Sequence, residues 1–206
     1  MNTPLKEIIQ GLSLLAAATA FCLGSATIAS ATVSSNRGQL SDKDYKFATE
    51  ALQGGALEVT LGQLAEQKAT DPSVREFAQR LVIEHKKANK ELTQLLTQKG
   101  ASLPDTMPKK SDKVSEKLQD ETGAGFDKSY IKRMVKDHKN DVEEFQKAAE
   151  KSDDTELKSW AATTLFTLQE HLRVAETVEK DLTSRSRDVC HRVDIWTRST
   201  ARPVIF

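Results

Sequence analysis

The sequence has few of the residues that build disulfide-linked, aromatic-rich or strand-rich proteins. Its 206 residues include 2 cysteines and 5 prolines, and aromatic residues make up 5%. Valine and isoleucine form no alternating runs, so we do not expect strands. The two cysteines, Cys22 and Cys190, have neither zinc-finger nor haem-attachment spacing. These absences favour an all-α fold, and the length suffices for one domain with a sizeable core.

The charge pattern argues against a nucleic-acid partner. The formal net charge is zero, but residues 32–183 carry 24 Lys and Arg against 27 Asp and Glu. A mildly acidic surface repels phosphate backbones, so we expect no binding to nucleic acid. The sequence also has no nucleophile motif, no glycine-rich phosphate loop and no pair of catalytic carboxylates. We therefore predict no catalytic residue, and an enzyme ranks last among the functions considered.

The first 31 residues have the pattern of a secretory signal peptide. Lys6 provides a weakly positive start, residues 8–23 are mostly apolar, and residues 29–31 have the small-x-small pattern of a cleavage site. The alternative is an uncleaved membrane anchor, but the apolar run is short and interrupted by polar residues. Cleavage would leave Cys190 as the only cysteine. We expect a periplasmic or otherwise exported protein of the cell envelope, with no transmembrane segment after cleavage.

Four long helical patterns follow a flexible segment at 32–41. They cover about 42–70, 72–99, 127–150 and 154–183, with Ser41, Asp71, Asp127 and Asp153 as expected N-caps. A long connection, residues 100–126, joins the second pattern to the third and contains a short amphipathic stretch at 112–122.

Apolar positions along these segments recur in alternating steps of four and three. A period near 3.5 residues packs helices almost parallel, at crossing angles of about 20°. Two hairpins joined by one long connection between helices 2 and 3 match the ferritin-like variant of the four-helix bundle. We therefore predict an all-α, ferritin-like bundle over residues 42–183.

Residues 184–206 do not continue this pattern. They contain five arginines and no lysine, and they lack an apolar stripe. We predict a basic, disordered tail, and the alternative is a basic arm that contacts an anionic surface.

Each apolar stripe contains one ionisable residue near the middle of its helix. Residues at mid-helix meet at mid-height in a bundle of matched helices, whichever way each helix runs. Three imidazoles and one carboxylate at one level form a candidate metal site. The alternative is a set of neutral histidines that are hydrogen-bonded without a metal. The four candidate ligands are Glu58, His85, His138 and His171.

Carboxylates lie close to these histidines in the sequence. Asp141 follows His138 by three residues and shares roughly its face of the helix. Glu84, Asp137 and Glu170 each precede a histidine directly, so each points about 100° away from it. They either orient an imidazole on a neighbouring helix or meet water.

A combination of motifs occurs at 58–65, 74–85, 126–130 with the downstream His138, and 168–172. Together these stretches resemble a family of exported bacterial ferritin-like domains of unknown function, often labelled as outer membrane proteins. The resemblance covers about 44–180. It implies a ferritin-like bundle and an envelope location, and it implies no reaction. Leu81 and Glu84 stand where the family usually has Met and Asp, and the proline common near 166–168 is absent.

The histidine pattern differs from that of di-iron ferritins. Those proteins place a Glu three residues before a His on two helices, whereas here Val82 precedes His85 and Leu168 precedes His171 at that spacing. A histidine-rich site suits one transition-metal ion, such as Zn, Fe, Cu or Ni. The alternative function is a non-catalytic envelope stress or interaction protein without a metal. The sequence leaves open whether the protein forms a homo-oligomer or binds an envelope protein partner.

Overall fold

The computed structural model describes residues 37–102 and 113–200, without the side chains of 113–115 and 186–200. The predicted signal peptide at 1–31 lies outside the described residues, as do 32–36 of the predicted flexible segment and 201–206 of the predicted tail. All regular structure within the described ranges is helical. None of the helices in this part of the chain combines the length and apolar character that a membrane span requires.

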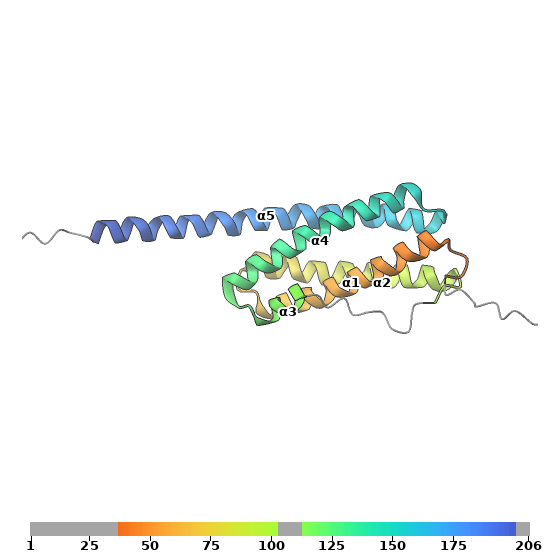
Figure 1. Ribbon diagram of the computed structural model, residues 1–206, viewed down its shortest axis with the longest axis horizontal. Coiled ribbons are helices and arrows are strands. Elements are labelled where there is room, and N and C mark those ends of the chain that lie inside the picture. The colour runs from red at the N-terminus through yellow and green to blue at the C-terminus, as the bar shows by residue number, and fades with distance from the viewer. Residues whose placement is uncertain (1–36, 103–112, 201–206) are drawn as a thin grey trace, which may run out of the picture. The chain divides into compact units, whose positions relative to one another are not determined.

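Helices α1 (Asp42–Lys68) and α2 (Pro72–Gln98) form the first hairpin (Figure 1). The predicted caps are confirmed, because Ser41 accepts a hydrogen bond from the backbone of α1 and Asp71 accepts one from the backbone of α2. Gly100 follows α2 with a φ of 68°, a conformation that glycine adopts without strain.

Helices α4 (Gly123–Lys151) and α5 (Thr155–Thr200) form the second hairpin. α4 begins earlier than predicted, because the backbone N–H of Phe126 already donates to the carbonyl of Thr122 at 3.3 Å. The predicted N-cap Asp127 therefore lies inside α4. The cap of α5 is Asp154 rather than Asp153: its carboxylate accepts from the N–H groups of the next helical turn.

The backbone of α5 continues past residue 183, where the apolar stripe ends, and stays helical to Thr200. The prediction of a disordered tail is therefore wrong for residues 184–200, while 201–206 lie outside the described residues. The physical reason is that this stretch contains no glycine or proline. The loss of an apolar stripe indicates a loss of burial, and it does not by itself end a helix.

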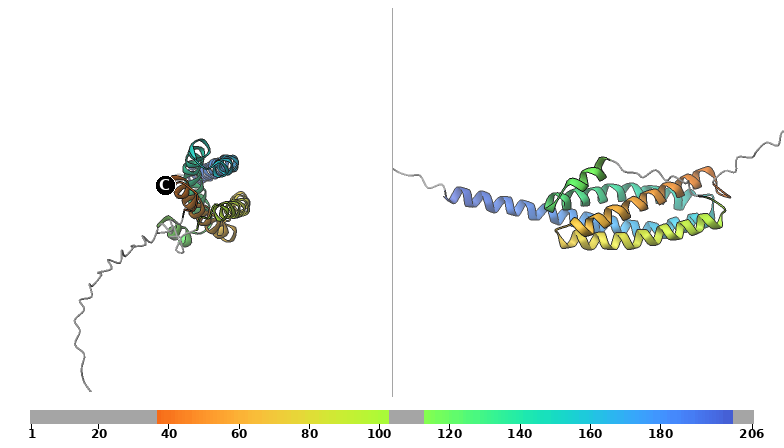
Figure 2. Two further views of the ribbon diagram at one scale, coloured as in Figure 1. Left: turned by 90° about the vertical axis from the view of Figure 1, so that its right-hand side faces the viewer. Right: turned by 90° about the horizontal axis from the view of Figure 1, so that it is seen from below.

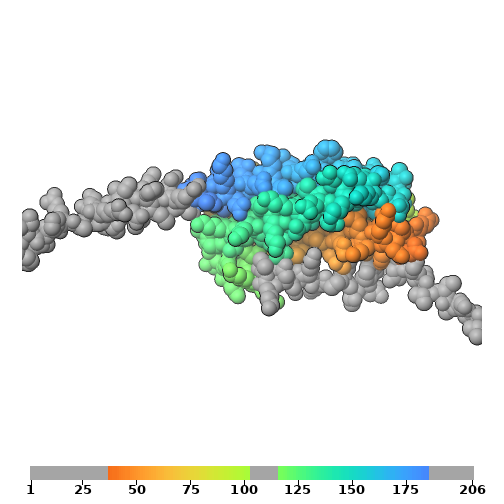
Figure 3. Space-filling view, turned by 45° about the horizontal axis from the view of Figure 1, so that its top comes forward, coloured from red at the N-terminus to blue at the C-terminus, as the bar shows by residue number. Residues whose placement is uncertain are grey.

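The two hairpins pack side by side into a four-helix bundle (Figures 1 and 2). α2 packs against α5, and α1 packs against α4. α2 ends beside the start of α1, where Gln39 N–H donates to the Lys99 carbonyl at 2.9 Å. α4 starts at the opposite end, so the two ends of the predicted long connection lie at opposite ends of the bundle, while its residues 103–112 lie outside the described ranges. Figure 3 shows the face on which α4 and α5 lie side by side.

Within that connection, the predicted amphipathic segment forms α3 (Lys113–Asp120). Leu118 is the buried residue of α3, with 1% of its surface exposed, and it joins the apolar core. Lys68, in the last turn of α1, donates to the Leu118 carbonyl at 3.4 Å. α3 is therefore held against the end of α1.

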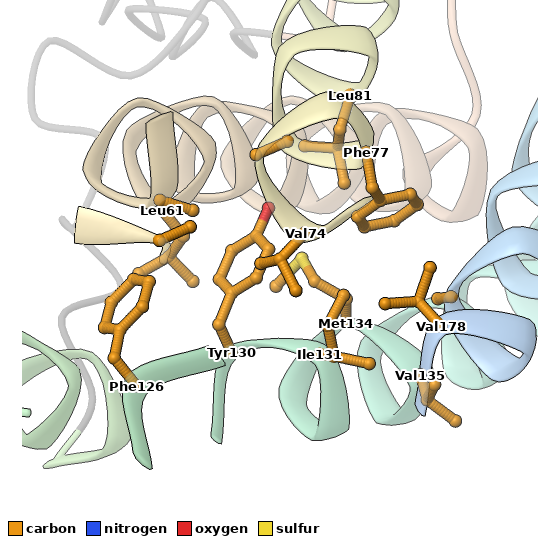
Figure 4. Close-up of a cluster of buried hydrophobic side chains, with 14 of the residues drawn as sticks. Leu61, Val74, Phe77, Leu81, Phe126, Tyr130, Ile131, Met134, Val135 and Val178 are labelled. Atoms are coloured by element: carbon orange, nitrogen blue, oxygen red, sulfur yellow. The ribbon is translucent and has the colours of Figure 1, made fainter. Parts of the chain in front are cut away.

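Apolar side chains fill both ends of the bundle. One large cluster occupies the end where α1 stops and α4 starts, and it includes Phe77, Tyr130 and Met134 (Figure 4). Two smaller clusters occupy the other end, around Leu92 and Phe145. Along every long helix, the ionisable residue of the seam falls between these two apolar regions.

Two buried aspartates link the hairpins in a reciprocal way. Asp44, near the start of α1, accepts hydrogen bonds from the backbone N–H groups of Asp153 and Asp154, both at 2.9 Å. Asp127, near the start of α4, accepts from the N–H groups of Thr70 at 3.1 Å and Asp71 at 2.9 Å. Each carboxylate thus binds the turn of the other hairpin, just before the helix that Asp71 or Asp154 caps, where N–H groups favour an anion.

We predict that Asp127→Ala and Asp44→Ala each lower the free energy of unfolding by about 2 kcal/mol, because each leaves buried N–H groups without an acceptor. Urea denaturation at neutral pH measures the effect. Asp153→Ala is the matched control, since its side chain makes an exposed ion pair with Lys43 and the loss is expected to be below about 1 kcal/mol. Equal losses of unfolding free energy in Asp127→Ala and Asp153→Ala would show that the buried carboxylate does not stabilise the turn of the opposite hairpin.

Candidate metal centre

The four predicted ligands come from four different helices and meet in the middle of the bundle. Glu58 lies on α1, His85 on α2, His138 on α4 and His171 on α5. Their exposed fractions are 3%, 6%, 0% and 1%, so all four are shielded from solvent. The expectation that these residues face one another at one level agrees with this geometry. Their role as ligands stays a prediction.

The three imidazoles are mutual neighbours. Their ring centroids are 5.7 Å apart for His85 and His138, 5.3 Å for His85 and His171, and 5.2 Å for His138 and His171. One ring nitrogen from each histidine lies within 4.8 Å of the other two. This spacing matches a set of nitrogen ligands around one cation with little further movement.

Glu58 lies against two of the three histidines. Its Oε2 is 3.2 Å from His85 Nε2, and its Oε1 is 3.3 Å from His138 Nδ1. These distances are short, but the angles are poor: among the described residues, neither Glu58 Oε1 nor His85 Nε2 has a hydrogen-bond partner. Both atoms are buried and polar, a combination that is rare without a partner of another kind.

Two of the histidines are oriented by groups that only accept hydrogen bonds. His138 Nδ1 lies 3.0 Å from the Met134 carbonyl, and His171 Nε2 lies 2.5 Å from Glu84 Oε2. A carbonyl and a carboxylate offer no proton, so each ring donates its own proton there. Glu84 also accepts from Arg80 at 3.0 Å, which keeps it an acceptor.

The remaining nitrogens of these two rings then face each other without a proton. His138 Nε2 and His171 Nδ1 are 3.2 Å apart. The contact of His138 with the Met134 carbonyl, the contact of His171 with Glu84 and the contact between the two rings would each need a proton. Two neutral rings carry only two protons. A third proton or a cation between the rings would make this contact favourable.

Burial works against the third proton. It lowers the pKa of His171 to about 3, and it also lowers the pKa of His138. The pKa of His85 falls well below its ordinary value, first through burial and then through the two neighbouring rings. All three rings are therefore neutral at neutral pH, with lone pairs available to a metal ion.

The carboxylate of Glu58 is also neutral when no cation is bound. Burial and, to a lesser extent, the charge of Asp137 raise its pKa from 4.5 to about 8, and Arg133 opposes the shift. A metal ion would displace this proton, because ligands bind metals in their deprotonated forms. The donor set is thus three neutral imidazoles with one carboxyl group that ionises on binding.

The nearby carboxylates divide between the two roles considered from the sequence. Glu84 orients an imidazole on a neighbouring helix, since it holds His171 across the α2–α5 contact. Asp137 pairs with Arg133 on its own helix, and Glu170 pairs with Arg173 at 2.7 Å. Asp141 offers an oxygen within 4.8 Å of ligand atoms of Glu58 and His138.

Sequence reasoning missed the residues that fix the rings in place. Phe77 packs edge-on against His138 and His171, with centroid distances of 6.4 and 6.3 Å. The Met134 carbonyl selects the tautomer of His138, as any residue four positions before a helical histidine can do. Arg80 lies four residues before Glu84, and this spacing is the sequence feature that predicts their ion pair.

The sequence matches one protein family over most of its length. Residues 29–178 match a domain of unknown function, DUF4142. The chain belongs to the DUF4142 family. No curated protein matches it. The family membership is consistent with a domain that spans the whole bundle, and it brings no assigned reaction.

Solved structures of another domain of unknown function, DUF305, share the fold of this DUF4142 chain. A DUF305 fragment from Deinococcus radiodurans has a TM-score of 0.63 at 14% identity, covering 69% of this chain and 98% of its own. A protein described as secreted, DUF305 from Streptomyces coelicolor, has a TM-score of 0.61 at 14% identity, covering 68% and 93%. At this identity the likeness shows the helical-bundle fold alone.

We predict that Glu58→Gln stabilises the metal-free protein at pH 8 more than at pH 5, by about 2–4 kcal/mol, since one pKa unit is worth about 1.4 kcal/mol. The unfolded chain loses the Glu58 proton near its ordinary value of 4.5, and the folded protein keeps it to about 8. The wild-type stability therefore falls as the pH rises through this window, and glutamine removes the fall.

Urea denaturation with a chelator at both pH values checks this prediction. Glu50→Gln is the control, because Glu50 lies on the same helix with an exposed side chain. A Glu58→Gln effect that is the same at pH 5 and pH 8 would show that the carboxyl group titrates normally.

Proposed function

We propose that this protein is an exported, ferritin-like helical bundle that binds one transition-metal ion through His85, His138 and His171, with Glu58 as a fourth ligand. The observation that carries the proposal is the contact of His138 Nε2 with His171 Nδ1 at 3.2 Å, with both opposite ring nitrogens committed to acceptors. Two facing lone pairs repel each other unless a positive species lies between them.

The groups that orient His138 and His171 are of the same chemical types as those that orient histidine ligands in known metal sites. Histidine ligands usually donate their second ring N–H to a carboxylate or a backbone carbonyl, which fixes the ring and strengthens the ligand. Glu84 does this for His171, and the Met134 carbonyl does it for His138. A buried network without a metal would gain nothing from leaving Glu58 Oε1 and His85 Nε2 without partners.

The ligand set favours Zn, Fe, Cu or Ni over magnesium or calcium, because imidazole nitrogen outnumbers oxygen. A dinuclear iron centre is disfavoured, since Val82 and Leu168 occupy the positions of its glutamates. The export part of the proposal rests on the signal-like residues 1–31 and on the word "secreted" in the description of the Streptomyces coelicolor neighbour.

The alternative is an envelope stress or interaction protein without a metal. A large exposed apolar patch would favour it. Among the described residues, the exposed large hydrophobic side chains are Ile83 and Phe166, on different helices. Two such side chains are ordinary for a protein surface, so the observations support the metal site better.

We predict that the wild-type protein binds one Zn²⁺ per chain in isothermal titration calorimetry, and that His85→Ala with His138→Ala abolishes binding because two of three nitrogen ligands are gone. His191→Ala is the control, since this histidine lies outside the four candidate ligands. Circular dichroism must show a folded double variant. Absence of stoichiometric binding with Zn²⁺, Cu²⁺, Ni²⁺ and Fe²⁺, or unchanged binding by the double variant, would refute the proposal.

We predict that Glu84→Gln weakens metal binding by about 10–100-fold, as losses of such orienting groups do in other sites. The amide no longer acts as a pure acceptor, so the tautomer of His171 is no longer fixed. Glu91→Gln is the matched control on the same helix, because Glu91 forms an exposed pair with Lys87. Equal affinities of the two variants would show that Glu84 does not position His171.

A further inference from the structure

The site is closed on most sides, so a cation needs a route to it. Apolar clusters block both ends of the bundle. On the α2–α5 side, Arg80 lies 3.0 Å from Glu84 and 3.7 Å from Glu170. His171, which Glu84 contacts there, has 1% of its surface exposed, so these paired side chains cover that side of the site. The α1–α4 side differs, because a cleft of about 100 Å³ opens there.

This cleft leads to the buried carboxyl group of Glu58. Its lining includes Gly54 and Glu58 from α1, and Asp137 and Asp141 from α4. Glu58 is 3% exposed, and its Oε1 has no hydrogen-bond partner among the described residues. One oxygen of Asp141 lies within 4.8 Å of a ligand oxygen of Glu58 and a ring nitrogen of His138. An unpartnered, buried oxygen therefore lies at the inner end of an acidic cleft.

Charge in the cleft favours a cation. Arg133 also lines it, but its guanidinium is paired with Asp137, which offsets the two charges. With Asp141 and Glu58, the lining has three carboxyl groups against this one guanidinium. Carboxylate oxygens bind divalent cations that keep part of their water shell, whereas the three histidines beyond bind them through nitrogen.

Glu58 belongs to both sets of ligands. Its Oε1 lies on the side of His138 Nδ1, and its Oε2 lies on the side of His85 Nε2. His138 Nδ1 is committed to the Met134 carbonyl, so a cation in the cleft would be held by oxygens alone. Glu58 can therefore bind a cation in the cleft with Oε1, and it can bind a cation among the histidines with Oε2.

We infer, building on the metal-binding function proposed above, that Asp141 and Glu58 form an outer, oxygen-ligand site for a divalent cation, and that cations reach the three histidines through this cleft. At Gly54, which lines the cleft, a Cβ atom would meet no atom within 4 Å. A long side chain there would have space to lie across the opening.

Stopped-flow absorbance with Co²⁺, whose spectrum reports its ligands, tests the route. We expect Asp141→Asn to slow Co²⁺ uptake by about 10-fold, in the range by which charged clefts speed association, and to leave one Co²⁺ per chain with the wild-type spectrum. We expect Gly54→Leu to slow uptake and chelator-driven release together, with the affinity within about twofold of wild type. Glu143→Gln, an exposed acidic residue two positions from Asp141, is the control.

The outcomes separate the route from the metal site itself. Wild-type uptake rates in both Asp141→Asn and Gly54→Leu, with Co²⁺ still bound at the histidines, would overturn the route and leave the proposed function standing. Loss of bound Co²⁺ in Asp141→Asn would make Asp141 a ligand of the final site and overturn its outer role. Absence of Co²⁺ binding by the wild type, together with the calorimetric result above, would overturn both proposals.

Discussion

The relative height of the two hairpins is the constraint on which the centre of this bundle depends. Four ionisable side chains from four helices meet only if no helix slides along its neighbours. One residue of slippage moves a side chain by about 1.5 Å, and one turn moves it by about 5.4 Å, which is the spacing of the imidazoles themselves. The carboxylates of Asp44 and Asp127 fix this height, because each binds backbone N–H groups at the turn of the opposite hairpin.

Burial then determines the chemical state of the centre. Away from water, the neutral form of every ionisable group is favoured, so the rings lose their extra proton and Glu58 keeps its own. Neutral rings with fixed tautomers are good metal ligands and poor hydrogen-bond partners for one another. The burial that stabilises the core therefore also keeps its three imidazole rings free of positive charge.

Much of the architecture could be predicted from the spacing of apolar residues. The caps Ser41 and Asp71, the long connection and its amphipathic segment follow from local rules, and they are confirmed. The meeting of the seam residues could be predicted because mid-helix positions coincide in any bundle of matched helices. The ring nitrogens that face each other depend on helix rotation and side-chain rotamers, and a seam pattern does not contain that information.

The roles of Asp127 and of residues 184–200 could not be predicted for a related reason. An aspartate beside a glycine-rich stretch looks like the cap of its own helix, whereas Asp127 binds the backbone N–H of Asp71, 56 residues away in sequence. Local sequence shows local partners only. The missing apolar stripe of the tail describes what a helix packs against and not whether the backbone is helical.

The close approach of α1 to α2 gives the backbone an influence on which ion could be held. A methyl group at Gly62 would lie 2.6 Å from Val82 Cγ2 and 3.3 Å from the Ala78 carbonyl, so α2 would have to move outward. His85 follows Val82 on the same helix and would move with it. A glycine with no polar side chain thus helps to set the distance between α1 and α2 beside the proposed metal site.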